Sequence, residues 1–370
     1  MDLDHLLPHN IQELKPYVAG KTIAEVKKEY KLNRISKLAS NENRLGCSPV
    51  VKDAVLRALQ QIQDYPDPIA GELRKKIADR YGIKEEEVIL AAGSESIISI
   101  LCKTFFKNGE NAVTADATFV GFFVQAGVRG VDLKKVPVTS DYRFDIDAIL
   151  DAVDEDTKMI YIANPNNPTG TYINKNEYGK LLKGLPDHIL LIMDEAYFEY
   201  ARSVSDYPNA LENRPENVIV LRTFSKAYGL AGFRIGYGFA DEGLITEMLK
   251  TKLTFEPTTT AQFAAFAALD DQEFIEKSVE TVKNGINRIT RFFDLHDIGY
   301  AQSISNSVLM ILESEEEAVE FTQRMLERGV ILRRVNAFGL PNCIRITIGT
   351  DDEMNHFEES FREIYSTQKS

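Results

Sequence analysis

Several features that mark common classes of protein are missing from this chain. Its three cysteines, Cys47, Cys102 and Cys343, lie far apart and form no CxxC pair, so we expect free thiols in a reducing compartment. Its five histidines form no HExxH motif and show no zinc-binding spacing, which argues against a metal enzyme. No apolar run approaches the roughly 20 residues that a membrane-spanning helix needs. We therefore expect no disulfide framework, no metal site and no membrane span.

Positive charge is also scarce, because 43 Lys and Arg residues face 56 Asp and Glu residues, for a formal net charge of −13. Nucleic acids and anionic membranes require clustered Lys and Arg, so neither is an expected partner. The N-terminal MDLDHLLPHN contains acids and no long apolar run, so we expect no signal peptide and a cytoplasmic protein. The phosphate-binding motifs GxxxxGK[ST] and strand-GxGxxG are missing, which argues against a nucleotide-binding protein.

The arrangement of apolar runs predicts a parallel sheet. The chain has 370 residues, 44% of them hydrophobic and 27% charged, which is typical of a soluble globular protein of about two domains. Strands are expected within EVILAAG, NAVTADATF, KMIYIANPNNPTG, HILLIMDEAYFEY and NVIVLRTFSKAYG. Helical patterns such as SIISILCKTFF lie between them. Apolar strands separated by helices favour a parallel sheet covered by helices on both faces.

The last third of the chain has a different pattern. QEFIEKSVETVKNGINRITRFFDLH predicts a long amphipathic helix. It is followed by NSVLMILES, the helix EEEAVEFTQRMLERG and the strands VILRR and CIRITIG. These elements predict an α+β domain, on which we expect the first 35 or so residues to pack. Because TFEPTTT interrupts the pattern near 255, we assign 36–255 to a large domain and 1–35 plus 256–370 to a small one.

Reactive side chains follow the expected strands. Ligand sites in parallel sheets lie at the carboxyl ends of the strands. Asp194 ends an apolar strand, where a carboxylate is costly unless it meets a partner such as a cation or a protonated ring nitrogen. Lys226 follows another strand among small residues, and a partly desolvated lysine is a nucleophile toward carbonyl groups. The rigid loop NPNNPTG could fix the amide of Asn167, and Tyr197 could add a phenol.

Another set of side chains suits a phosphate group. Ser94 can cap the helix that follows AAG, and the free N–H groups of its first turn, including that of Glu95, form a phosphate cradle. The planar guanidinium of Arg234 suits the same group. Thr223 and Ser225 could add hydroxyl donors.

Each of these features alone has an ordinary structural explanation, such as a helix cap, a loop or a solvated lysine. Together they require one ligand that carries a phosphate, a ring nitrogen, a phenolic oxygen and an aldehyde. Pyridoxal 5′-phosphate carries all four. Lys226 would take its aldehyde and Asp194 its ring nitrogen. Asn167 and Tyr197 would take its ring oxygen.

Motifs along nearly the whole chain resemble the fold-type-I pyridoxal-phosphate aminotransferases. They are LKPYVAGKTIAEV, KLASNEN, YPD, ANPNNPTGTY, MDEAYFEY, RTFSKAYGLAGFRIGYG and GLPNCIRITIGT. Within that family, KPYVAGK and GLPNCIRITIGT are similar to the histidinol-phosphate subgroup. The resemblance implies a three-layer αβα large domain with a mostly parallel seven-stranded sheet, plus a smaller α+β domain. It also implies a homodimer. The implied reaction is transamination between histidinol phosphate and the 2-oxoglutarate/glutamate pair in histidine biosynthesis.

The resemblance also implies roles for further residues. Tyr65 of YPD would reach the cofactor phosphate in the neighbouring subunit, and Phe122 would stack on the cofactor ring. Arg345 would hold the anionic group of the substrate. The remaining residues expected at the substrate pocket or the domain junction are Tyr17, Asn43 and Arg333.

Some positions depart from the family pattern. Phe122 stands where tyrosine is common, and TFEPTTT replaces a PFN segment. Proline is usual at the positions of Ala19 and Arg44. Proline or a small residue is common at the position of Arg334. These departures leave the cofactor chemistry intact and bear on the amino donor.

Three alternative functions stay open at this point. An aromatic amino acid aminotransferase would use the same cationic clamp, and a threonine-phosphate decarboxylase shares the scaffold. A non-catalytic regulator would need a DNA-binding extension, for which residues 1–40 are short and not basic.

Overall fold

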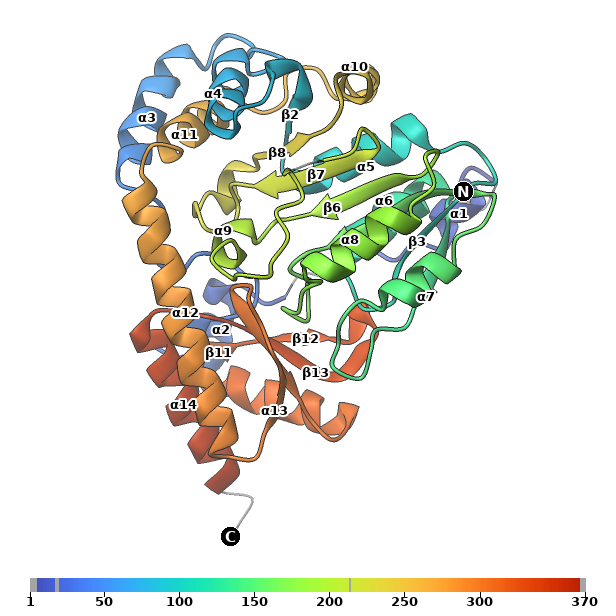
Figure 1. The fold of residues 1–370 in the computed structure, drawn as a ribbon. Coiled ribbons are helices and arrows are strands. Elements are labelled where there is room, and N and C mark those ends of the chain that lie inside the picture. The colour runs from blue at the N-terminus through green and yellow to red at the C-terminus, as the bar shows by residue number, and fades with distance from the viewer. Residues whose placement is uncertain (1–4, 17–19, 213, 367–370) are drawn as a thin grey trace.

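The large sheet organises the molecule. The computed structural model describes residues 5–16, 20–212 and 214–366. Within these ranges seven strands form one sheet in the order β2-β8-β7-β6-β5-β3-β4 (Figure 1). The strands are β2 (Val88–Ala91), β3 (Asn111–Ala115), β4 (Asp132–Val136), β5 (Thr157–Ala163), β6 (Leu190–Asp194), β7 (Val218–Thr223) and β8 (Gly236–Phe239). β8 runs antiparallel to both neighbours and the other pairs are parallel, which confirms the mostly parallel seven-stranded sheet.

Helices cover both faces of this sheet. Successive side chains of a strand point to opposite faces, and in β5 Met159 and Tyr161 join one apolar cluster while Ile160 and Ile162 join another. The first cluster includes α5 (Ser94–Phe105), α6 (Val120–Arg129) and α10 (Glu242–Thr251). The second includes α7 (Ile146–Asp151) and α8 (Lys175–Gly184). β5, β6 and β7 are therefore almost entirely buried, and their polar ends lie at the edge of the layers.

A second sheet lies in the C-terminal part. Its four strands in the described chain are antiparallel and ordered β12-β13-β10-β9. They are β9 (Gly299–Ala301), β10 (Ser307–Ile311), β12 (Arg333–Val335) and β13 (Leu340–Thr347). The helices of this part are α12 (Gln272–Asp294), α13 (Glu315–Glu327) and α14 (Asp351–Ser366). α12 runs along the side of the molecule from the level of α11 to that of α14 (Figure 1).

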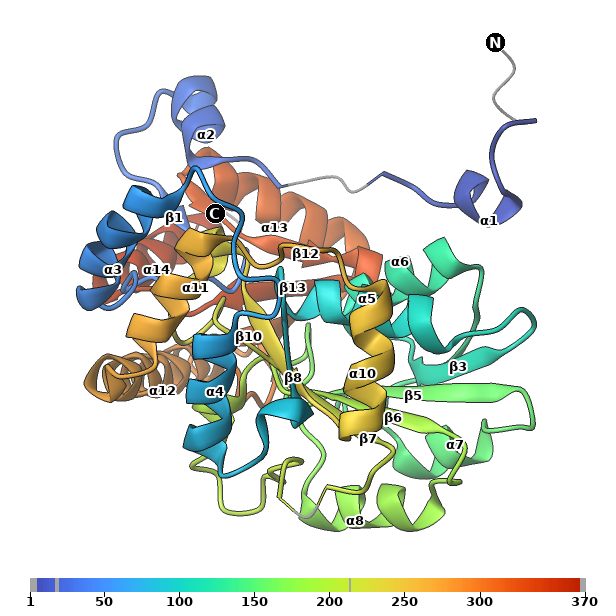
Figure 2. The ribbon, with the colours of Figure 1, turned by 90° about the horizontal axis from the view of Figure 1, so that it is seen from above.

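The N-terminal segments divide between the two parts. In α1 (His9–Gln12), the Asn10 amide donates to the carbonyls of Gly127 and Val128 at the end of α6. α2 (Ile23–Tyr30) instead packs through Val26 on β11 (Val330–Ile331), which pairs in parallel with β1 (Ser36–Lys37). Residues 23–37 thus contact the C-terminal part, whereas α1 lies on the helical layer of the large sheet (Figure 2). The domain boundary near 255 stays a prediction.

The remaining helices form a group at one end of the large sheet. α3 (Val50–Ala58), α4 (Gly71–Tyr81) and α11 (Thr259–Ala268) pack together, and α9 (Phe198–Ala201) follows β6. Short 3-10 turns occur at η1 (Leu59–Gln61), η2 (Glu85–Glu87), η3 (Ala231–Phe233) and η4 (Asn336–Phe338). None of the helices in the described ranges is long and apolar enough to cross a membrane. The three cysteines are free thiols.

A buried ion pair joins β6 to β7. Arg222 is fully buried and donates from Nε and Nη2 to Oε2 of Glu195 at 3.0 and 2.8 Å. Its guanidinium also lies 3.3 Å from the ring centroid of Phe198. Sequence patterns did not indicate this pair, because an arginine inside an apolar strand gives no sign of its partner.

We expect Arg222→Met to destabilise the protein strongly. The substitution leaves the Glu195 carboxylate buried without its cation, which costs about 3–5 kcal/mol. Lys75→Met is a suitable control, because it breaks an exposed pair with Asp79 worth about 0–1 kcal/mol. Urea unfolding at pH 8 measures both losses, and equal losses would contradict a structural role for the buried pair.

Candidate functional site

The carboxyl ends of three neighbouring strands bring the predicted residues together. Asp194 is the last residue of β6 and pairs in register with Ala163 of β5 and Leu221 of β7. Asn167 follows β5 and Lys226 follows β7, so both lie at the same edge of the sheet. The Nζ atom of Lys226 lies 5.6 Å from the ring centroid of Tyr197. The predicted amine, carboxylate and phenol thus share one edge.

The Asp194 carboxylate is held by two donors inside the protein. It is 4% exposed. Its Oδ2 accepts a hydrogen bond from the Tyr161 hydroxyl at 2.7 Å, and Oδ1 accepts one from the Ala196 N–H at 3.2 Å. Burial raises the pKa of Asp194 to about 6, while these hydrogen bonds and the nearby Lys226 cation oppose that rise. The site therefore contains a carboxylate poised to pair with a positive group.

Phe122 does not face the site as expected. Its ring is fully buried and stacks on Tyr161, with centroids 4.3 Å apart and planes 6° from parallel. A ring that stacks on a bound ligand needs one exposed face, and Phe122 has none. Phe119, at the N-terminal end of α6, is half-buried. Phe122 instead supports the tyrosine that holds Asp194.

The start of α5 forms a cradle for an anion. Gly93 occupies the N-cap position and has no side chain that could accept hydrogen bonds from the first N–H groups of α5. The N–H groups of Ser94 and Glu95 therefore have no side-chain cap. Arg234 approaches from the loop after β7, and its Nη1 lies 3.5 Å from the Ser225 hydroxyl. The Thr223 hydroxyl donates to Ser225 at 3.0 Å. A helix N-terminus, hydroxyls and a guanidinium converge here, as anion binding requires.

Two glycines keep this cradle open. Gly93 has φ 92°, and a Cβ there would lie 2.9 Å from Nη2 of Arg234. A Cβ on Gly236 would lie 2.4 Å from the backbone nitrogen of Ser94. Any larger residue would displace the guanidinium or the helix start, so the sequence fits a phosphate-sized group at this position.

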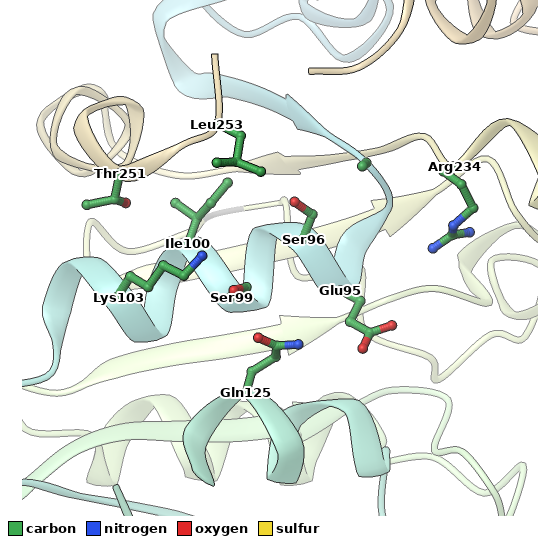
Figure 3. Close-up of a pocket in the computed structure, with 10 residues that line it drawn as sticks. Glu95, Ser96, Ser99, Ile100, Lys103, Gln125, Arg234, Thr251 and Leu253 are labelled. Carbon is green, nitrogen blue, oxygen red and sulfur yellow. The ribbon is translucent and has the colours of Figure 1, made fainter. Parts of the chain in front are cut away.

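A pocket of about 250 Å³ continues from the cradle along α5. Figure 3 shows Arg234 at one end and Lys103 at the other, with Gln125 of α6 facing α5. Its lining residues are Ala92, Glu95, Ser96, Ser99, Ile100, Lys103, Gln125, Arg234, Thr251 and Leu253. Two of them, Glu95 and Arg234, belong to the predicted phosphate site, so the pocket adjoins that predicted site.

An arginine from the C-terminal sheet reaches the same edge. Arg345 of β13 is 6% exposed and donates from Nη1 to Oδ1 of Asn167 at 2.5 Å and from Nη2 to the Ala39 carbonyl at 2.8 Å. Arg333 of β12 is its register partner, so both side chains lie on one face of the sheet. Like charges directly opposite one another are unfavourable, and a bound anion would relieve that repulsion. Tyr17, predicted to line this pocket, lies outside the described residues.

Two asparagines of the SNEN segment form hydrogen bonds with residues of the candidate site or its neighbouring loop. Asn43 donates from Nδ2 to the Ala227 carbonyl at 2.8 Å and to Ser278 of α12 at 2.9 Å, which ties the Lys226 loop to that helix. Asn41 donates from Nδ2 to the Tyr197 hydroxyl at 2.8 Å. Sequence reasoning did not select Asn41, although it lies two residues from Asn43.

The other predicted positions lie away from the strand ends. Tyr65 is 80% exposed and stacks on Phe255, with ring centroids 4.3 Å apart. Arg44 pairs with Glu353 at 2.7 Å, and Arg334 pairs with Glu315 at 2.6 Å. These two unusual arginines therefore have structural partners. Among the described side chains, no group of three or more His, Cys, Asp or Glu is placed to hold a metal ion.

Comparison with known proteins yields consistent matches. The family model described as aminotransferase class I and II matches residues 33–361. A histidinol-phosphate aminotransferase from Geobacillus sp. (strain WCH70) is 44% identical over 345 residues, which cover 93% of each chain. A histidinol-phosphate aminotransferase from Bacillus subtilis (strain 168) is 40% identical over 349 residues, covering 94% of this chain and 96% of the relative.

Solved structures agree with these matches. The crystal structure of histidinol-phosphate aminotransferase from Sinorhizobium meliloti in complex with pyridoxal-5′-phosphate superposes with a TM-score of 0.88 at 28% sequence identity. The match covers 97% of this chain and 98% of that chain.

We expect Asp194→Asn to stabilise the ligand-free protein at neutral and alkaline pH. The folded protein keeps the Asp194 proton up to about pH 6, whereas an unfolded aspartate loses it near pH 4. Between these values the folded state binds more protons, so stability falls as pH rises. Above pH 6 the loss in the free energy of unfolding is complete. It amounts to about 3 kcal/mol, because the folded and unfolded pKa values of Asp194 differ by about two units.

Asparagine cannot ionise, so the variant escapes this loss. Urea unfolding between pH 3.5 and 8 should show little difference at the acid end and a more stable variant at pH 8. A pH dependence identical to that of the parent protein would refute this account of the Asp194 carboxylate.

Proposed function

The chain belongs to the aminotransferase class I and II family, and from that premise we propose that it transfers an amino group between histidinol phosphate and 2-oxoglutarate with pyridoxal 5′-phosphate as cofactor. One observation carries the proposal: an amine, a buried carboxylate, a phenol and an anion cradle converge at one sheet edge beside paired arginines. The relatives named for histidinol phosphate support the choice of substrate.

The residues fit this cofactor group by group. When bound, it supplies an aldehyde that links to amines and a protonated ring that stabilises negative charge on the substrate α-carbon. Lys226 is proposed to hold the aldehyde through Nζ, and Asp194 to pair with the ring nitrogen. Asn167 and Tyr197 are assigned to the ring oxygen. The phosphate is assigned to Ser94, the Glu95 N–H, Thr223, Ser225 and Arg234.

Three of these residues carry the chemistry. Lys226 would hold the cofactor through its aldehyde and, when released by the substrate amine, its Nζ would carry a proton between the substrate α-carbon and the cofactor. Asp194 would pair as a carboxylate with the ring nitrogen, supported by the hydrogen bonds that it accepts from the Tyr161 hydroxyl and the Ala196 N–H. Tyr197 would donate to the ring oxygen. Phe119, rather than Phe122, is proposed to stack on the ring.

The paired arginines are proposed to select the substrate. Arg345 and Arg333 would hold the phosphate of histidinol phosphate, and Arg345 would hold a carboxylate of 2-oxoglutarate or glutamate in the other half-reaction. Asn167 links Arg345 to the cofactor site. Asn43 is proposed to act by holding the Lys226 loop, since its amide donates to Ala227 and Ser278. Tyr17 is assigned to the same pocket.

A homodimer in the cytoplasm completes the proposal. Exposed apolar side chains lie on α3, on η1, on the loop after them and on the segment after α10. The loop and the segment after α10 meet where Tyr65 stacks on Phe255. Those more than two-fifths exposed are Val50, Leu56, Leu59, Ile62, Tyr65, Ile69 and Leu253. An apolar surface of this kind favours association. Tyr65 would then reach the cofactor phosphate of the partner subunit.

The amino donor is tested by single half-reactions. The cofactor-loaded protein is mixed separately with histidinol phosphate, phenylalanine and threonine phosphate, without an amino acceptor. We expect histidinol phosphate to convert the cofactor's absorbance to that of its amino form, because the paired arginines match a phosphate. Lys226→Ala should lose the visible band of the lysine-linked cofactor and essentially all turnover.

Other outcomes identify the alternatives. Conversion with phenylalanine and not with histidinol phosphate would favour an aromatic amino acid aminotransferase. Carbon dioxide release from threonine phosphate would identify a decarboxylase. A protein that binds the cofactor and responds to none of the amines would contradict the proposed activity altogether.

The shared site is tested by mixing two inactive variants. Tyr65→Ala removes an exposed side chain and should weaken cofactor binding, whereas Lys226→Ala removes the chemistry. In a mixed dimer, one site carries both lesions and the other carries neither. Activity should therefore return to about a quarter of the wild-type value after the subunits are exchanged at random. Mixtures that stay inactive although mass spectrometry detects mixed dimers would mean that Tyr65 serves its own subunit.

A further inference from the structure

The backbone and side chain of Asn41 are fully engaged inside the protein. The residue is 1% exposed and has φ 54°, a conformation that asparagine tolerates. Its backbone N–H donates to the Thr347 hydroxyl at 2.9 Å, and its carbonyl accepts from Asn306 at 2.9 Å. Its side-chain Oδ1 accepts from the Thr347 hydroxyl at 2.9 Å, and Nδ2 donates to Tyr197 at 2.8 Å.

This network determines which way the Asn41 amide points. The Thr347 hydroxyl already accepts from the Asn41 N–H, so its single hydrogen is available to donate. The atom that receives this hydrogen must be Oδ1, since an amide NH₂ group is a donor. Nδ2 therefore faces Tyr197. In the alternative orientation the Thr347 hydroxyl would accept from both Nδ2 and the Asn41 N–H, and its own hydrogen would lose Oδ1 as a partner.

The amide in turn fixes the role of the Tyr197 phenol. The phenol oxygen accepts the Nδ2 hydrogen, so its own hydrogen must point elsewhere. Tyr197 is 2% exposed and its ring lies beside the amine of Lys226. A buried hydroxyl needs a partner for its hydrogen, and we infer that the ring oxygen of the proposed cofactor supplies it. Asn41 thus makes Tyr197 a donor there.

The same short segment also contacts the substrate arginine. The Ala39 carbonyl accepts from Nη2 of Arg345, and Thr347 lies two residues after Arg345 on β13. Residues two apart on a strand share a face. A movement of Arg345 would therefore displace Asn41, because β13 is hydrogen-bonded to both Ala39 and Asn41.

We propose that Asn41 is a positioning residue that orients the Tyr197 phenol as a hydrogen-bond donor to the ring oxygen of the cofactor and ties it to the strand carrying Arg345. The inference rests on the proposed function, since it assumes the cofactor in this site. Asn41 itself touches neither substrate nor cofactor.

The expected consequence is a change in the cofactor's titration. A fixed donor to the ring oxygen stabilises negative charge there and makes the proton shared with the lysine nitrogen easier to lose. Without Asn41 the phenol hydrogen can turn away, and that proton is held to higher pH. We expect Asn41→Gly, which tolerates the positive φ, to raise the midpoint of the absorbance titration by about one pH unit.

The experiment is a pH titration of the visible absorbance of the cofactor-loaded protein without substrate. Tyr197→Phe should shift the midpoint in the same direction. The double variant Asn41→Gly/Tyr197→Phe should shift it no further than Tyr197→Phe alone, because Asn41 acts through the phenol. Asn217→Ala is the control, since its amide donates to the Ile189 carbonyl away from the site, and it should leave the midpoint unchanged.

Thr347→Val provides a second test should Asn41→Gly fail to fold. It leaves Asn41 in place and removes the hydroxyl that sets its amide, so a smaller shift in the same direction is expected. Unchanged midpoints in the folded variants, or additive shifts in the double variant, would overturn the role of Asn41. A wild-type protein that takes up no pyridoxal phosphate would instead refute the proposed function, so the two failures are distinguishable.

Discussion

The burial of one carboxylate, Asp194, at the end of β6 is the constraint on which the rest of the site depends. A charged group in that position is unfavourable unless donors face it, and the Tyr161 hydroxyl and the Ala196 N–H fill that need. Tyr161 is in turn held by the parallel ring of Phe122. A functional charge is thus kept in place by residues whose own contribution is packing and hydrogen bonding, a common arrangement around reactive groups.

The site is also a junction between two sheets. The large sheet contributes Asp194, Asn167 and Lys226 from the ends of parallel strands, whereas β13 of the C-terminal sheet contributes Arg345. Direct side-chain hydrogen bonds join the two contributions, from Arg345 to Asn167 and from Asn41 to Tyr197. These bonds would therefore set the distance between the proposed cofactor end and the proposed substrate end of the site.

Much of this arrangement could be predicted because it depends on local patterns. β2, β3, β6 and β7 each lie within the segment in which a strand was expected, and β5 begins one residue before its segment, since a run of apolar residues ending in turn-forming residues leaves few alternatives. The rule that ligands bind at the carboxyl ends of parallel strands then brought Asp194, Asn167 and Lys226 to one edge. Expectations about which side of a helix or loop faces the site were less accurate. Phe122 points into the protein, and α1 packs on α6 rather than on the C-terminal part.

The kinds of group in the proposed site could therefore be predicted from the sequence: a lysine, an acid at a strand end, a phenol and a helix start suited to an anion, each recognisable from residue type and its place after a strand. Their partners were decided by tertiary structure. Asn41 lies 156 residues from Tyr197 and 306 from Thr347, and no local pattern relates positions so far apart. Hydrogen bonds depend on distance and direction in space, so the choice of Asn41, Tyr161 and Arg222 as supporting residues required the folded chain.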